Sequence, residues 1–221
     1  MTIAVEVFES FASEAAARLA LELSRASSII LTGGTAAAAV YSQLPEGCLR
    51  RGASVFFSDE RCVPPDHGAS NYAMAVSRLS LRSDDGVVVH RMRGEDEPGQ
   101  AAADYHDAIA PFAGQGIDMA LLGLGSDCHV AALFPGSPAL ESRERLCSAV
   151  DRPDGLRGLT LTPPALTRCK RVFVIVSGKS KKEAVGRLLR GNETLHECPA
   201  RLLAELPDVI LLGDRDSAAV A

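Results

Sequence analysis

Apolar and polar residues follow two distinct patterns along this chain. Short, nearly continuous apolar runs have the length of buried strands, and between them apolar residues recur at helical spacing. The predicted strands cover residues 3–8, 28–32, 53–58, 87–90, 117–122, 159–162, 171–177 and 209–212. The predicted helices cover residues 11–23, 35–44, 70–81, 98–113, 181–190 and 200–206.

This alternation predicts an α/β fold: a mainly parallel open sheet with helices on both faces, as in Rossmann-like proteins. No internal repeat or low-complexity linker interrupts the pattern, and the Gly/Asp/Arg-rich segment 151–158 is interpreted as a surface loop. We therefore expect a single domain over residues 1–221, a length that one α/β core accommodates.

Composition narrows the classes of function. The chain has 28 acidic and 23 basic residues, a net charge of −5, which argues against nucleic-acid binding and requires local cations for any anionic substrate. The six cysteines show no metal-ligand spacing, and scattered cysteines are typical of a reduced, cytoplasmic protein. The sequence begins with no signal-peptide pattern and has no apolar run of membrane-spanning length. We therefore expect a cytoplasmic protein without a membrane partner.

The first stretch with candidate chemistry is the turn after the predicted strand 28–32. Gly33, Gly34 and Thr35 lead directly into an alanine-rich helix. Glycines let the backbone approach an anion closely, and the N–H groups at a helix start favour negative charge, so this turn can hold a phosphate. The alternative is a plain tight turn capped by Thr35.

The second stretch places three charged residues, Asp59, Glu60 and Arg61, after the apolar strand 53–58. Charges at such a place are costly unless they are solvated, paired or functional. A guanidinium there suits a phosphate or carboxylate oxygen. The alternative is that Asp59 and Arg61 pair with each other or with neighbouring loops.

The third stretch, residues 123–136, is the most informative. It follows the predicted strand 117–122, and in open α/β sheets ligands bind at the carboxyl ends of strands. Asp127 and His129 lie where the chain is expected to enter a short helix, and a histidine can transfer a proton near neutral pH. The alternatives are a loop histidine bonded to its own backbone, and a dinucleotide site, which Cys128 at the third glycine position disfavours.

In this order, the motifs resemble those of the 6-phosphogluconolactonase family, in the glucosamine-6-phosphate isomerase/6-phosphogluconolactonase superfamily. That family has a Thr-Gly-Gly turn, an Asp-Glu-Arg-x-Val-Pro motif followed by Ser-Asn, and a Gly-x-Gly-x-Asp-Gly-His motif leading to Leu-Phe-Pro. The matching segments here are 32–34, 59–64, 70–71, 123–129 and 133–135, with further matches at 159–162, Gly178, Lys181 and 199–200. The resemblance extends over most of the chain.

The related glucosamine-6-phosphate deaminases carry an Asn-Glu-Pro motif after the histidine, and its glutamate supplies an acidic partner. This chain has Leu133, Phe134 and Pro135 at that place. The absence of a glutamate favours the lactonase over the deaminase.

Two positions depart from the family pattern. Cys128 replaces the glycine between Asp and His, where a positive φ would cost a side chain on the order of 1 kcal/mol or more and the thiol could narrow the pocket. A thiol nucleophile is disfavoured because sequence neighbours rarely point at each other. Gly158 aligns with the arginine that normally precedes the Thr-Leu-Thr strand, and Arg157 lies one residue earlier, where a small loop shift would restore its reach.

The resemblance implies hydrolysis of 6-phosphogluconolactone to 6-phosphogluconate in the pentose phosphate pathway, with no metal or other cofactor. It implies His129 as the general base that activates water, Arg61 as a cation for the carbonyl or the phosphate, and Asp127 as a substrate contact or loop-shaping residue. The residues expected to bind the substrate and its phosphate are Gly33, Gly34, Thr35, Asp59, Arg157 and Lys181. For Asp127 a helix cap, and for Lys181 a solvated lysine, are the structural alternatives.

Two other functions stay open at this point. One is a sugar-phosphate-binding protein that has lost catalysis, which Cys128 motivates, and the other is a deaminase-like enzyme. In each case the expected partner is a small-molecule sugar phosphate, and the family resemblance implies a monomer.

Overall fold

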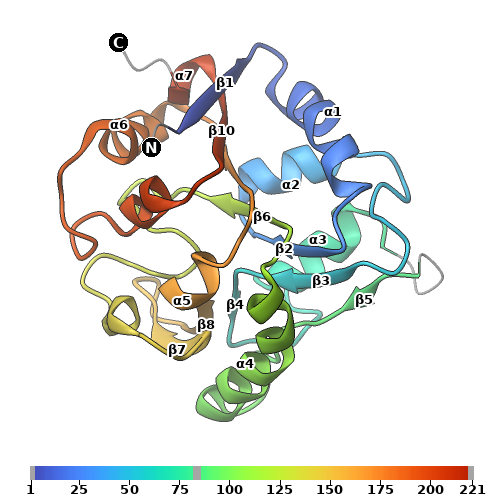
Figure 1. Ribbon diagram of the computed structural model, residues 1–221, viewed down its shortest axis with the longest axis vertical. Helices are drawn as coiled ribbons and strands as arrows, with labels where there is room; N and C mark the ends of the chain where they lie inside the picture. Colours follow the sequence, from blue (N-terminus) through green and yellow to red (C-terminus); the bar gives the residue numbers. More distant parts are fainter. Residues whose placement is uncertain (1–2, 82–85, 219–221) are drawn as a thin grey trace.

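A seven-stranded parallel sheet forms the centre of the protein, which we describe from a computed structural model covering residues 3–81 and 86–218 (Figure 1). The strand order is β1-β10-β9-β6-β2-β3-β5, and all six neighbouring pairs run parallel. The strands are β1 (Ala4–Phe8), β2 (Ser28–Leu31), β3 (Ser54–Phe57), β5 (Val88–Val89), β6 (Met119–Gly123), β9 (Val172–Val176) and β10 (Val209–Asp214). The predicted parallel open sheet is confirmed.

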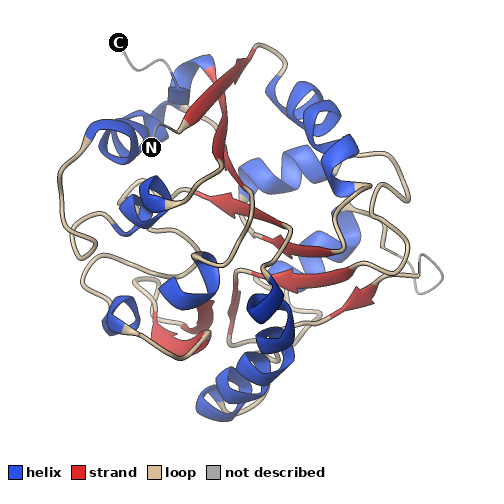
Figure 2. Ribbon diagram, viewed as in Figure 1, coloured by secondary structure: helices blue, strands red, loops and turns tan. Residues whose placement is uncertain are grey.

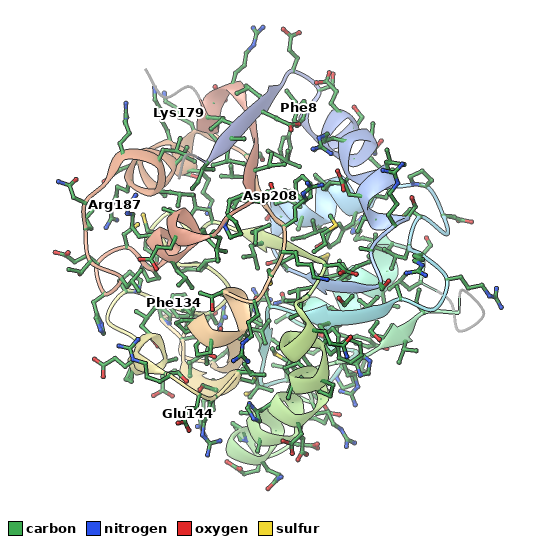
Figure 3. All side chains as sticks on the ribbon, viewed as in Figure 1. Phe8, Phe134, Glu144, Lys179, Arg187 and Asp208 are labelled. Carbon is green, nitrogen blue, oxygen red and sulfur yellow. The ribbon has the colours of Figure 1, made fainter. Side chains whose placement is uncertain are left out.

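Helices cover both faces of this sheet, as predicted, and side chains fill the space on either side (Figures 2 and 3). The α-helices are α1 (Phe11–Leu23), α2 (Thr35–Tyr41), α3 (Asn71–Arg78), α4 (Pro98–Gln115), α5 (Pro163–Leu166), α6 (Lys182–Arg190) and α7 (Arg215–Ala218). Side chains alternate along each strand, so Ile29 and Leu31 pack towards α1 and α2, whereas Ile30 packs towards α4. Both faces of the central strands are apolar because both are covered.

A second, three-stranded antiparallel sheet was not predicted. It consists of β4 (Asp59–Arg61), β8 (Arg157–Leu161) and β7 (Cys147–Asp151), in the order β4-β8-β7. After β3 the chain leaves the parallel sheet at Ser58, and the charged residues that follow pair with β8 instead. The strand predicted over 159–162 is present as part of β8, and segment 151–158 is the turn of the β7–β8 hairpin with the strand ends beside it. Leu159 and Leu161 lie in the same apolar cluster as β6 and β9.

Several helical segments also differ from the prediction. The helix predicted over residues 200–206 is the 3₁₀ helix η3 (Pro199–Glu205). Lys181 ends another 3₁₀ segment, η2 (Lys179–Lys181), before α6 begins, and η1 (Pro138–Glu141) was not predicted. No helix follows His129, where a short one was expected: residues 124–137 form turns and an isolated bridge.

The strand order places the loops after β2 and β6 at a topological switch point. These two strands are neighbours, but the chain continues from β2 to β3 on one side and from β6 to β9 on the other. Loops that diverge at the carboxyl ends of adjacent parallel strands leave a crevice between them. The crevice lies between the turn after Thr32 and the loop that carries His129.

Candidate active site

A cavity of about 140 Å³ occupies this crevice. Its lining residues come from the two switch-point loops, the small antiparallel sheet and the segment before α6. They are Thr32, Gly33, Gly34, Asp59, Arg61, Asn71, Gly123, Leu124, Gly125, His129, Ala131, Arg152 and Lys181. The structure thus brings together predicted site residues that lie far apart in the sequence.

His129 faces this cavity with its ring fixed by Asp127. The Nδ1 atom lies 2.6 Å from Asp127 Oδ1, and the same oxygen accepts the main-chain N–H of His129 at 3.2 Å. Because an ionised carboxylate only accepts, Nδ1 carries the hydrogen and Nε2 is left with the lone pair. A Cβ at Gly125 would lie 2.1 Å from His129 Nδ1, so only glycine allows this pair to rest on the loop backbone.

The pairing also sets the ionisation of Asp127. Partial burial acts to raise the pKa of its carboxyl group, but the hydrogen bond and charge of His129 outweigh it and lower the pKa to about 2. The carboxylate is therefore ionised throughout the neutral range. The interpretation of Asp127 as a helix cap was wrong, because no helix follows.

The loop around His129 bends twice instead of forming a helix. Cys128 and Ala131 have positive φ angles of 72° and 53°, which a right-handed helix excludes. Thr160 Oγ1 accepts the N–H of Ala132 at 3.0 Å and ties the loop to β8. The positive φ expected at position 128 is thus present, but the thiol does not narrow the cavity: it is fully buried and its Sγ lies 3.8 Å from Ala184 O.

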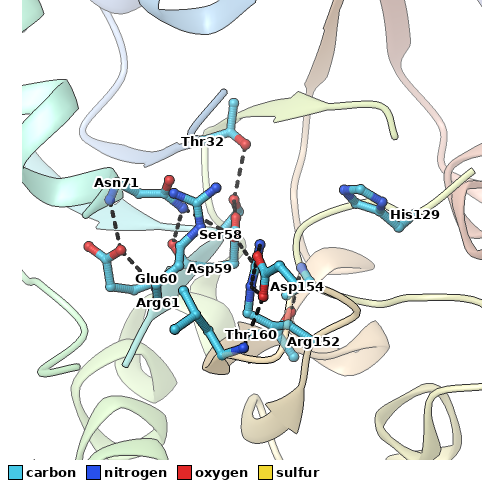
Figure 4. A network of polar contacts seen from close by, with 12 residues as sticks. Thr32, Ser58, Asp59, Glu60, Arg61, Asn71, His129, Arg152, Asp154 and Thr160 are labelled. Carbon is cyan, nitrogen blue, oxygen red and sulfur yellow. Dashed lines mark hydrogen bonds and ion pairs between the residues drawn. The ribbon is translucent and has the colours of Figure 1, made fainter. Parts of the chain in front are cut away.

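Asp59 and Arg61 both line the cavity, and they do not pair with each other in the described part of the chain. The Asp59 carboxylate accepts hydrogen bonds from Ser58 Oγ at 2.8 Å and from Asn71 Nδ2 at 3.1 Å (Figure 4). Arg61 donates from Nη1 to Ala69 O at 2.5 Å, and its buried Nε has no partner. The guanidinium is therefore held in place with donor capacity unused.

Glu60 supports the site indirectly, because its buried carboxylate accepts hydrogen bonds from the start of α3. It accepts the N–H groups of Arg61, Asn71 and Tyr72 at 2.7–2.8 Å and the hydroxyl of Ser70 at 2.9 Å. Burial raises the pKa of this carboxyl group, and the four hydrogen bonds oppose that shift. The contact places Asn71 against Gly33 and Asp59 at the cavity wall.

Lys181 and the Gly33–Gly34 turn form the opposite wall. Both also line an adjoining cavity of about 410 Å³, together with Thr35, so four of the predicted phosphate-binding residues are neighbours. Among residues 3–81 and 86–218, the Lys181 ammonium has no ion-pair partner. A cation of this kind is available to a bound anion.

Two predicted site residues, Asp127 and Arg157, line neither cavity, and of these only Asp127 contacts a residue that does. Arg157 lies apart from the site. Its side chain is 55% exposed and lies 3.8 Å from Asp151. Arg152, which the sequence analysis did not single out, lines the cavity instead, as does Asn71. The Ser-Asn motif was a signal for Asn71, whereas Arg152 lies in a polar segment without any pattern that marks it.

The cavity lining carries more positive than negative charge, although the net charge of the chain is −5. It contains three cations, Arg61, Arg152 and Lys181, and one carboxylate, Asp59. Within the described residues, no three His, Cys, Asp or Glu side chains are arranged to hold a metal ion. None of the described helices has the length and apolarity to cross a membrane. Fold and site define an α/β protein with a cation-lined cavity beside a His–Asp pair.

Comparison with known proteins gives the family. A family model described as glucosamine-6-phosphate isomerases/6-phosphogluconolactonase matches residues 3–211. A Synechocystis 6-phosphogluconolactonase is 34% identical over 86% of this chain and 82% of its own length, and the human 6-phosphogluconolactonase is 32% identical over 86% and 75%. The chain belongs to the glucosamine-6-phosphate isomerase/6-phosphogluconolactonase family.

Solved structures agree on the fold. The 6-phosphogluconolactonase from Trypanosoma cruzi is 27% identical and superimposes with a TM-score of 0.82 over 99% of this chain and 97% of that one. A monomeric glucosamine-6-phosphate deaminase superimposes with a TM-score of 0.84 at 21% identity, over 100% of each chain. The fold alone therefore does not separate the two activities, and the separation has to come from the site.

Proposed function

We propose that this protein hydrolyses 6-phosphogluconolactone to 6-phosphogluconate, with His129 as the general base. The observation that supports it most directly is the His129–Asp127 pair, which leaves Nε2 as the proton acceptor at a cation-lined cavity. The curated relatives named above are 6-phosphogluconolactonases, and the match extends over most of this chain.

The reaction follows from this placement. His129 Nε2 takes a proton from water as the water oxygen attacks the lactone carbonyl carbon, and the carbonyl oxygen becomes an oxyanion. Arg61 is the cation available to stabilise that charge. When the intermediate collapses, the ring C–O bond breaks and the imidazolium returns its proton to the leaving alkoxide. The carboxylic acid product then loses its proton to solvent, and the base is regenerated.

The phosphate has a separate place in this proposal. Lys181 and the Gly33–Gly34 turn line both cavities, and they would hold the terminal phosphate of the sugar where the two cavities adjoin, with Thr35 on the side of the larger one. Asp59, held by Ser58 and Asn71, faces the sugar hydroxyls with a carboxylate oxygen. We assign Arg157 no role because its side chain lies outside both cavities.

The site disfavours the deaminase alternative. Phe134 occupies the place where the deaminase pattern has a glutamate, and its ring packs on His129 with centroids 4.6 Å apart. An apolar ring at this contact supplies no second acid.

The test compares substrates for the purified protein in buffer with a metal chelator. Opening of the lactone at neutral pH yields a carboxylate and a proton, so a weakly buffered pH indicator follows it directly. We expect rapid proton release from 6-phosphogluconolactone above the spontaneous rate, and no ammonia from glucosamine 6-phosphate. Ammonia production, or loss of lactonase activity with the chelator, would contradict the proposal.

A further inference from the structure

Arg152 is the least expected side chain in the cavity. It begins the turn between β7 and β8, yet its side chain is only 9% exposed. The guanidinium carbon lies 5.5 Å from the centroid of the Phe134 ring, and Nε and Nη2 donate to Asp154 at 3.0–3.3 Å. The β7–β8 turn therefore places the guanidinium of Arg152 in the cavity, where Phe134 and Asp154 hold it.

Part of that guanidinium is unused. Nη1 lies 3.8 Å from Asp59 Oδ2, which is beyond hydrogen-bond distance. Two N–H groups on Nη1 thus remain for a ligand in the cavity that Lys181 and His129 also line. Asp154 holds the other edge of the guanidinium from outside, with 48% of its own side chain exposed.

Gly158 provides the path that Arg152 follows. A Cβ at position 158 would lie 2.9 Å from Arg152 Cδ, 3.4 Å from its Cγ and 3.1 Å from Glu60 O. The stem of Arg152 thus rests on the backbone of β8 where any other residue would place its own side chain. A side chain starting at position 158 would occupy the same channel that Arg152 now fills.

We propose that Arg152 supplies the guanidinium for the substrate phosphate, and that Gly158 is the residue that makes this possible. This inference rests on the proposed function, because it takes the ligand to be a sugar phosphate. Positions 152 and 158 form one unit, because their side chains would occupy the same channel. An arginine at either position can reach the site, but two arginines cannot fit together. The phosphate then lies between Arg152 and Lys181, that is, between the free Nη1 end of a guanidinium and the point charge of an ammonium.

The test measures kcat/KM for 6-phosphogluconolactone, and by calorimetry the Kd values for 6-phosphogluconate and for gluconate, which lacks the phosphate. Arg152→Gln is expected to lower kcat/KM and weaken 6-phosphogluconate binding by about 10- to 150-fold, the range for charge-assisted hydrogen bonds. Gluconate binding should stay within about twofold. Arg157→Gln is the comparison variant, since the sequence alone assigned the phosphate to that arginine.

Two further variants test the unit itself. Gly158→Ala displaces the Arg152 stem and should weaken 6-phosphogluconate binding while Arg152 is present. The double variant Arg152→Ser, Gly158→Arg should recover at least about tenfold of the binding lost in Arg152→Ser. Arg152→Lys keeps the charge and serves if the glutamine variant does not fold; it should weaken binding because the fork is lost.

The outcomes separate the two claims. If the wild type binds 6-phosphogluconate more tightly than gluconate but does not hydrolyse the lactone, the proposed function fails while the binding assay still tests Arg152. If the wild type is active and Arg152→Gln binds 6-phosphogluconate normally, or weakens gluconate equally, Arg152 is not the phosphate ligand. A loss in Arg157→Gln of the size predicted for Arg152→Gln would overturn the inference too.

Discussion

Replacing Asp127 with asparagine should slow catalysis without weakening substrate binding. Asp127 lies outside the cavity lining and contacts the reaction only through His129, at 2.6 Å from Nδ1. The imidazolium formed during catalysis is stabilised by this carboxylate, and the neutral amide removes the charge-assisted part of the bond. The amide can also turn its NH₂ group towards Nδ1 and favour the wrong tautomer.

The size of the effect follows from the contact. A hydrogen bond to a charged group contributes about 1.5–3 kcal/mol, and the Asp127 side chain is 44% exposed, so solvent screening favours the lower half of that range. A loss of about 1.5–2 kcal/mol corresponds to a fall in kcat of roughly 10- to 30-fold. KM should change by less than about twofold.

The assay is steady-state proton release from 6-phosphogluconolactone at neutral pH, with Asp151→Asn as the matched control. Asp151 makes an ion pair on the surface, and its side chain is 96% exposed, so that variant should behave as the wild type. An unchanged kcat in Asp127→Asn, or a loss seen only in KM, would refute the role of Asp127 in orienting and stabilising His129.

Three further predictions concern stability and reactivity. Glu60→Gln turns an amide NH₂ towards two of the four groups that now donate to the carboxylate. We expect the free energy of unfolding to fall by about 2–4 kcal/mol and the melting temperature in calorimetry to fall by roughly 5–10 °C. An unchanged melting temperature would contradict the anchoring role of Glu60. Asp127 has a folded-state pKa lowered to about 2 from 3.8, so the stability it contributes is complete above the unfolded pKa and lost as the pH falls through the folded one. The stability difference between wild type and Asp127→Asn in urea should shrink as the pH falls from about 4 to 2, and a difference that grows over this range would be inconsistent with the pair. Burial and the contact with Cys198 raise the pKa of the Cys128 thiol to about 12, so mass spectrometry should find Cys128 unmodified after alkylation of the folded protein at about pH 8. Because the thiol is buried away from the cavity, Cys128→Gly should change kcat less than about threefold. A large gain in activity would favour the binding-protein alternative.

The sequence predicted the parallel sheet well because its central strands are buried on both faces. Runs such as 28–31 and 172–176 are buried at every position, and such runs are visible without knowledge of their partners. The small antiparallel sheet escaped prediction because β4 consists of Asp59, Glu60 and Arg61, residues that do not look like a strand. Their pairing with β8 depends on contacts about 100 positions away in the sequence, which no local pattern records.

Site residues that directly follow a predicted strand could be predicted from the sequence. Site residues whose position depends on side-chain packing could not. His129, Asp59 and Lys181 lie at the carboxyl edge because the strands before them end there. The helix expected after His129 is absent because Cys128 and Ala131 take positive φ angles, which the sequence did not show for alanine. Arg152 could not be chosen over Arg157 from the sequence, since the choice depends on the packing of the Arg152 stem against Gly158.

The most direct test of the account is hydrolysis of 6-phosphogluconolactone by the wild type and by His129→Ala, in metal-free buffer near neutral pH. His196→Ala is the control, because His196 is a partly exposed histidine outside the cavity. We expect rapid loss of lactone with the wild type and the control, and a rate lower by roughly 10²- to 10⁴-fold with His129→Ala. A wild type that does not accelerate lactone loss, or a His129→Ala variant that hydrolyses it at the wild-type rate, would contradict the central claim.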